Sequence, residues 1–158
     1  MKKIDWKNLS YDDFTGFVAV TAILLFVLYF GGLWYTTYDY RIQMRDQMVG
    51  MYQQLPNPIP PIEDDYGVHQ RWLVFYIDGV KVLNKPQPEN VINEYKKALE
   101  KEGWATEREY EHVRNDKNKI YGINMRKGEF ILSVSARENR DSINIHLIKR
   151  DWIYNKGF

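Results

Sequence analysis

The sequence contains no cysteine among its 158 residues. It therefore cannot form disulfides, and it has neither a thiol for catalysis nor the cysteine to which lipid is attached in lipoproteins. It also contains no glycine-rich phosphate loop, no serine in a nucleophile-elbow context and no paired carboxylates beside an evident cleft. These are the motifs that kinases, hydrolases and glycosidases use for catalysis. We therefore expect a protein that is not an enzyme and binds no cofactor.

Charge is also absent from one long stretch, the 25 residues between Asp13 and Asp39, FTGFVAVTAILLFVLYFGGLWYTTY. A helix rises about 1.5 Å per residue and the hydrocarbon core of a bilayer is about 30 Å thick, so about 20 apolar residues can cross it. The stretch predicts a transmembrane helix over residues 14–38. It ends in bulky Trp34 and Tyr35 rather than in the small residues of a cleavage site, which favours a retained anchor over a signal peptide.

Basic residues give this anchor a direction. Three lysines precede the span, and Arg41 and Arg45 follow it. The positive-inside rule then predicts a cytoplasmic tail over residues 1–13 and a single-pass protein of the cell (inner) membrane. The rest of the chain is expected on the other side, in the periplasm or outside the cell.

The interior of the span contains no ionisable residue and no Asn or Gln. Such residues mark ion or proton paths, so we expect this helix to anchor rather than conduct. Thr15, Ala19 and Ala22 recur at helical spacing and could let another helix approach closely. The alternative is that small residues are simply common in membrane spans.

Residues 39–55 are predicted to continue the helix as a stalk outside the membrane. Met44, Met48, Met51 and Leu55 fall on one helical stripe, at i, i+4, i+7 and i+11. An exposed stripe of this kind needs cover, and methionine is adaptable enough to pack on varied surfaces. We expect it to contact another subunit or copies of the same chain. The alternative is that the stalk folds back onto its own domain.

Residues 56–65 form a proline-rich linker, with four prolines between positions 56 and 61. Proline ends the stalk helix and favours an extended, stiff spacer or strap. The acidic cluster at residues 63–65 matches no calcium loop, so we interpret it as a solvated boundary.

Residues 66–158 are predicted to form a small α+β domain. The segment RWLVFYIDGVKVL is either one long strand with a bulge or a tight hairpin at Asp78 and Gly79. The next segment, PQPENVINEYKKALEKEG, predicts a helix that starts near Pro88 and is closed by Gly103.

Four more strands are predicted at about residues 104–114, 119–125, 130–136 and 142–148, joined by short polar turns that favour antiparallel hairpins. Apolar residues alternate in the last two strands, so the sheet should be buried on one face. The expected fold is a two-layer β-α-β-β-β-β domain with a mostly antiparallel sheet and one packed helix.

Candidate chemical groups in this domain are few. The histidines are His69, His112 and His146, and a zinc site would need them to meet a carboxylate such as Glu111, which their spacing does not specify. We therefore expect no metal. Glutamates at positions 107, 109 and 111 alternate with Arg, Tyr and His, a pattern typical of a solvated edge strand. The small, spread-out positive charge does not indicate nucleic acid.

Two functions remain open. The favoured hypothesis is a non-catalytic accessory or scaffolding subunit of a multi-component membrane complex, which contacts the lipid bilayer and other membrane subunits or its own copies through the span and stalk. The alternative is a membrane-anchored module that binds an envelope component, such as peptide, lipid or polysaccharide, through Trp72, Trp104 and Trp152. The residues predicted to form the partner interface are Thr15, Ala19, Ala22, Met44, Met48, Met51, Leu55, Trp152, Tyr154 and Phe158.

Overall fold

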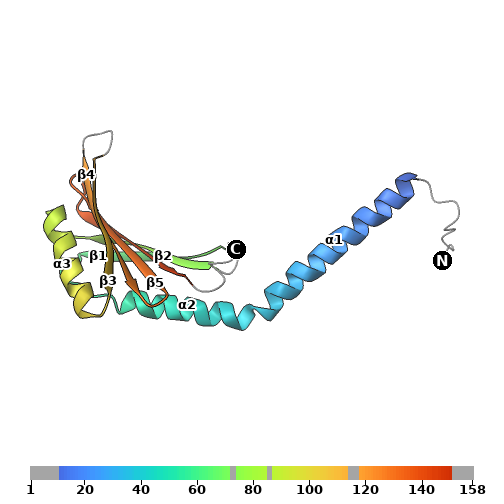
Figure 1. The fold of residues 1–158 in the computed structure, drawn as a ribbon, viewed down its shortest axis with the longest axis horizontal. Helices are drawn as coiled ribbons and strands as arrows, with labels where there is room; N and C mark the ends of the chain where they lie inside the picture. Colours follow the sequence, from blue (N-terminus) through green and yellow to red (C-terminus); the bar gives the residue numbers. More distant parts are fainter. Residues whose placement is uncertain (1–10, 72–73, 85–86, 114–117, 151–158) are drawn as a thin grey trace. The chain divides into compact units, whose positions relative to one another are not determined.

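The computed structural model describes residues 11–71, 74–84, 87–113 and 118–150 (Figure 1). The chain divides into two compact units, Met1–Ile42 and Gln43–Phe158. The first contains helix α1 (Tyr11–Thr36) and the start of helix α2 (Tyr38–Gln53), and the second contains the rest of α2 and the head domain.

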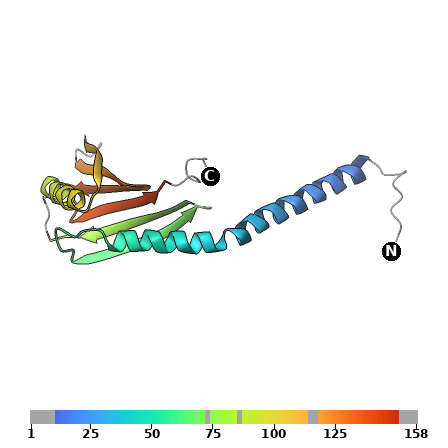
Figure 2. The ribbon, with the colours of Figure 1, turned by 60° about the horizontal axis from the view of Figure 1, so that its bottom comes forward.

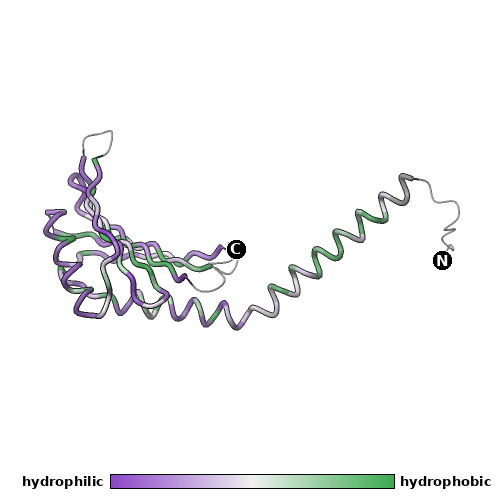
Figure 3. The backbone as a smooth tube through the Cα atoms, viewed as in Figure 1, coloured by the Kyte–Doolittle hydropathy of each residue, from purple (hydrophilic) through white to green (hydrophobic). Residues whose placement is uncertain are grey.

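Helix α1 has no charged residue after Asp13, and most of its later turns are green or white in Figure 3. Residues Thr15–Thr36 have a mean hydropathy of 2.3, and none of this segment is buried by the rest of the protein. The predicted N-terminal helix is therefore present, and its length and composition are compatible with a membrane anchor. It ends at Thr36, where the hydroxyls of Thr36 and Thr37 donate to the carbonyl oxygens of Gly32 and Leu33 at 2.9 and 2.7 Å. Such back-bonding loosens the regular helix.

The head is built on an open sheet of six strands in the order β1-β2-β6-β5-β4-β3, and every neighbouring pair is antiparallel. The broad prediction of an α+β fold with a mostly antiparallel sheet is confirmed. The four C-terminal strands lie within about two residues of their predicted positions. The strands are β1 (Glu63–Arg71), β2 (Val74–Val82), β3 (Ala105–Val113), β4 (Lys119–Lys127), β5 (Phe130–Arg137) and β6 (Ser142–Lys149).

The start of the head differs from the prediction. Residues 63–71 form a strand of their own, which pairs with β2 from Glu63↔Val82 to Arg71↔Val74. Asp78 and Gly79 lie in the middle of β2 in regular register with both neighbours, so they form neither a hairpin turn nor a bulge. Strand β1 was missed because it is polar on both faces: it is an edge strand and most of its residues are exposed.

Helix α3 (Pro88–Lys101) confirms the predicted helix. Proline occupies its first turn, and Gly103 follows its end with a φ of +84°, a conformation that favours glycine. The helix contacts β3, β4 and β5 and buries Val91, Ile92, Tyr95 and Leu99. It therefore covers the β3–β5 half of one sheet face.

The other half of this face is covered by α2 from Gln43 onward (Figure 2). Tyr52 lies over β2 so closely that a Cβ on Gly79 would fall 2.1 Å from its hydroxyl oxygen. At the other end of the contact, Lys149 Nζ donates to Gln47 Oε1 at 3.1 Å. The stalk predicted for residues 39–55 is thus, from Gln43, part of the head, as the alternative interpretation proposed.

A bulge in edge strand β3 changes the predicted row of glutamates. The register with β4 shifts between Thr106 and Arg108. Beyond the shift Glu109 pairs with Lys96 of α3 at 2.6 Å, whereas Glu107 pairs with Arg126. Arg126 alternates with buried Met125, so it belongs to the opposite face of the sheet. The three glutamates therefore do not share one face, because the extra residue reverses the alternation.

Candidate functional site

The sheet face away from α2 and α3 carries partly exposed side chains. Its central row crosses five strands in register, from Asp78 of β2 through His146, Ser133 and Asn124 to Arg108 of β3. We call this surface the open face. Other residues whose positions alternate onto it include His69, Tyr76, Val80, Ile131, Asn144 and Ile148.

Two histidines and a tyrosine surround Asp78 on the open face. His146 Nδ1 lies 2.6 Å from Asp78 Oδ1, and His69 Nε2 lies 3.8 Å from Asp78 Oδ2. The ring of Tyr76 stacks on His69, with centroids 5.0 Å apart and an interplanar angle of 18°, and lies 5.5 Å from the ring of His146. The side chains of His69, His146 and Asp78 are all about half exposed. We call these four residues the histidine cluster.

The histidine cluster resembles the orienting part of a catalytic triad in one respect only. Asp78 fixes His146 through Nδ1, and Ser133 is the cross-strand neighbour of His146. The backbone N–H groups around Ser133, however, belong to the ladders that β5 forms with β4 and β6. They cannot also stabilise an oxyanion, so the row does not supply backbone donors for an oxyanion hole at Ser133.

The histidine cluster was also compared with the ligand geometry of a metal site. Among the described residues, no group of three or more His, Asp or Glu side chains is arranged to hold a metal ion. Asp78 lies between His69 and His146 and contacts each of them separately. What the histidine cluster does offer is a set of partly exposed aromatic rings and hydrogen-bonding groups on one sheet face.

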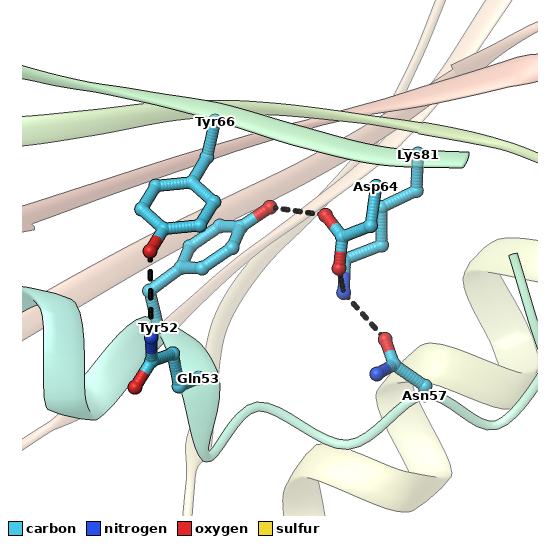
Figure 4. A network of polar contacts seen from close by, with 6 residues as sticks. All are labelled: Tyr52, Gln53, Asn57, Asp64, Tyr66 and Lys81. Carbon is cyan, nitrogen blue, oxygen red and sulfur yellow. Dashed lines mark hydrogen bonds and ion pairs between the residues drawn. The ribbon is translucent and has the colours of Figure 1, made fainter.

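A second polar group lies on the helix-covered face, where α2, the linker and the β1–β2 hairpin meet (Figure 4). Lys81 is only 1% exposed, and its Nζ lies 2.9 Å from Asp64 Oδ2 and 2.5 Å from Asn57 Oδ1. Tyr52 donates its hydroxyl to Asp64 Oδ1 at 3.0 Å, and its ring lies 4.7 Å from that of Tyr66 with the two planes tilted by 35°. We call Tyr52, Asn57, Asp64, Tyr66 and Lys81 the latch, because they join α2, the linker and the β1–β2 hairpin.

Burial and the carboxylate of the latch affect two tyrosines. Burial, the charge of Asp64 and its hydrogen bond raise the pKa of Tyr52 well above the usual range, and burial together with Asp64 does the same for the pKa of Tyr95 in α3. The hydroxyl of Tyr95 is buried, and it has no hydrogen-bond partner in the described part of the chain. The charge of Lys81 is neutralised by Asp64, and the polar groups of the latch bond to one another. We therefore interpret the latch as a structural feature that holds these segments together.

The predicted stalk interface is mostly inside the head. Met44, Met48 and Leu55 are 5%, 0% and 6% exposed, and Met51 is half-buried. These side chains therefore offer little surface to a partner. Their cover is the head itself, which a sequence pattern cannot distinguish from a second subunit because both are apolar.

The other predicted contact residues have different outcomes. Thr15, Ala19 and Ala22 are exposed on α1. Trp104, expected to bind an envelope component, is only 4% exposed and belongs to the core. Trp72, Trp152, Tyr154 and Phe158 lie outside the described residues.

The histidine cluster was missed by sequence reasoning, which named Glu111 only as an example of the carboxylate that a zinc site would need. Asp78 and His146 are 68 positions apart and meet because β6 inserts next to β2. The alternating pattern of β6 did place His146 opposite its buried residues. What the pattern could not supply was the identity of the neighbouring strand.

Comparison with known proteins gives no family or relative: no family model matches the sequence, and no curated protein or solved structure matches it significantly.

Proposed function

We propose that this chain is a single-pass membrane protein and serves as a non-catalytic accessory or scaffolding subunit of a membrane complex, with its N-terminus cytoplasmic and its head outside the cytoplasm. The observation that carries the proposal is the exposed apolar surface of α1. Four consecutive side chains, Leu25 to Leu28, point to different sides of this helix, and they are 58–70% exposed. Apolar surface of this extent needs lipid or other helices around it.

The head supports an assembly role in a second way. From Gln43 the helix that follows the anchor is packed into the sheet and held by the latch. Contacts made by the head are therefore made by a folded unit that begins at Gln43, seven residues after α1 ends at Thr36. The partners proposed are other membrane subunits, or copies of the chain, which contact Thr15, Ala19 and Ala22 on the anchor.

Affinity purification after detergent extraction tests this proposal. The full-length protein should elute above the size of one chain in its micelle, together with the same partner chains in repeated preparations. Changing Ala19 and Ala22 together to Ile should reduce that co-purification, since bulk prevents close helix approach. Val18 and Val20, also exposed on α1, changed to Ile provide the matched control. A monomer without partners would contradict the proposal.

A second candidate function is an anchored module that binds an envelope component. It is favoured by the histidine cluster, where His69 and His146 lie half exposed beside the partly exposed ring of Tyr76. Aromatic faces with adjacent hydrogen-bonding groups suit sugars and peptides. Retention of purified peptidoglycan fragments by the wild type, lost on changing Tyr76 and His146 to Ala but not Val80 to Ala, would select this function over the first.

A further inference from the structure

Arg41 has an unusual setting at the end of the anchor. Its side chain is only 8% exposed, and its guanidinium carbon lies 3.5 Å from the ring centroid of Trp34 and 5.7 Å from that of Tyr38. Nη2 donates to the carbonyl oxygen of Trp34 at 2.8 Å. Nε is buried and, within the described part of the chain, has no hydrogen-bond partner. A guanidinium carries five N–H donors, so beside the bond to Trp34 the side chain has remaining capacity to bind an anion.

The side chain of Arg41 points back toward the span. Helical backbone hydrogen bonds continue past Thr37, whose carbonyl oxygen accepts a hydrogen bond from the N–H of Arg41 at 3.0 Å. The carbonyl of Trp34 that Nη2 of Arg41 contacts belongs to a residue seven positions earlier, and seven residues of helix span about 10 Å. The charge of Arg41 is thus placed beside Trp34, at the last turn of the apolar segment, instead of one turn beyond it. In a bilayer that level is the boundary where phospholipid phosphates and amines lie.

A groove of about 690 Å³ opens beside this arginine. We call it the collar groove, and the residues used here are Gly31, Trp34, Tyr35, Tyr38, Asp39 and Arg41. It combines one cation, one anion and three aromatic rings. A phosphate fits a guanidinium, which presents its N–H groups in a planar fork. An ammonium group fits a carboxylate and the faces of aromatic rings.

We propose that the collar groove binds the headgroup of a zwitterionic phospholipid, with the phosphate on Arg41 and the ammonium near Asp39 and the tyrosines. This inference rests on the membrane anchoring proposed above. The charge complementarity selects the occupant: a headgroup with phosphate alone would place no cation near Asp39. The side of the membrane is irrelevant to the fit, because the groove lies at the end of the span in either orientation.

Native mass spectrometry of the full-length protein in detergent, titrated with phosphatidylethanolamine or phosphatidylglycerol, tests the inference. The wild type should retain phosphatidylethanolamine in preference to phosphatidylglycerol. Arg41→Gln should lower that retention about tenfold, as expected for the loss of a charge-assisted hydrogen bond. Asp39→Asn should remove the preference between the two lipids. Arg45→Gln, which removes an exposed charge on the next turn, should behave as the wild type.

Equal retention of both lipids by the wild type, or equal retention by Arg41→Gln and Arg45→Gln, would overturn the inference. Circular dichroism of each variant shows whether the helices and head remain folded, and Asp39→Asn tests the groove independently of Arg41. Alkaline carbonate extraction of liposomes separates this outcome from the parent proposal. Protein that resists extraction but shows no lipid selectivity contradicts only the collar groove, whereas protein that is extracted contradicts the anchoring.

Discussion

Gly79 shows how one residue sets the position of a helix. It lies in the middle of β2, and the hydroxyl, Cζ and Cε2 of Tyr52 occupy positions 2.1, 2.7 and 2.8 Å from where its Cβ would be. The ring cannot easily move, since Tyr52 is 3% exposed and bonded to Asp64. Glycine inside a strand marks such close approaches.

We expect Gly79→Ala to lower the free energy of unfolding of the head by about 1–3 kcal/mol, the usual cost of overpacking. Chemical denaturation followed by circular dichroism measures it. Gly50→Ala is the control: nothing lies within 4 Å of its Cβ position in α2, so there the change should be neutral or stabilising. Equal stabilities of the two variants would contradict the contact with Tyr52.

Tyr52 and Tyr95 should respond oppositely to loss of the hydroxyl at neutral pH. Tyr95→Phe removes a buried hydroxyl without a partner and should raise the free energy of unfolding by up to about 1 kcal/mol, while Tyr52→Phe breaks the bond to Asp64 and should lower it by about 1 kcal/mol. Paired denaturation curves measure the difference. Destabilisation of the same size in both variants would show that Tyr95 has a partner after all.

The raised pKa values of the two tyrosines predict a loss of stability in alkali. Below about pH 10, the ordinary pKa of tyrosine, both folded and unfolded chains keep these protons. Above it the unfolded chain releases them first, so the free energy of unfolding falls as pH rises toward the raised folded pKa values. Replacing Tyr52 and Tyr95 together by Phe should flatten that slope relative to the wild type. An unchanged slope would mean that other groups cause it.

At the scale of elements, α2 carries the greatest change of interpretation. Its methionine stripe is a core element of the head, because Met48 is fully buried within the unit that starts at Gln43. On the sheet, Gly79 lies against Tyr52 of this helix, and Ile77 and Leu147 are buried on the same covered face. The helix therefore contributes to folding as well as to connection.

We expect Met48→Ala to destabilise the head by about 2–5 kcal/mol through lost burial and the cavity left behind. Leu132→Ala, at an equally buried position of β5, should cost a similar amount. Met51→Ala, at a half-buried position, should cost clearly less. Thermal unfolding of the three variants measures this order. A harmless Met48→Ala would restore the view that this stripe faces a partner.

At the scale of the whole molecule, the basic residues on either side of α1 predict on which side of a membrane each end of the chain lies. The margin is small, with three lysines before the span and two arginines after it. The rule counts basic residues near the span ends, so it still favours a cytoplasmic N-terminus. The head, which carries the open face, would then meet partners outside the cytoplasm.

Protease added to intact spheroplasts should accordingly digest residues 66–158, and a tag at the N-terminus should stay protected until the membrane is permeabilised. Immunoblotting against both ends measures this. A cytoplasmic marker protein that survives the same treatment serves as the control. A head that is fully protected in intact spheroplasts would reverse the orientation and place the accessory role on the cytoplasmic side.

Local chemistry was sufficient to predict several elements. The uncharged run between Asp13 and Asp39 indicated the apolar helix, and Pro88 and Gly103 bounded α3 because their backbones favour helix starts and left-handed turns. Alternation in the last two strands gave their buried faces correctly. These features depend on residues a few positions apart, which a pattern can show.

Other features were decided only by tertiary structure. The cover of Met48, the pairing of β1 with β2, the bulge that separates Glu107 from Glu109, and the contact of Asp78 with His146 all depend on which segments become neighbours. A hydrophobic stripe indicates only that these side chains must be buried, without indicating by which segment. A polar edge strand is stabilised by its neighbour's backbone rather than by its own side chains. The sequence therefore determined the helices, most of the strands and their buried faces, and the order of strands in the sheet determined which polar groups meet.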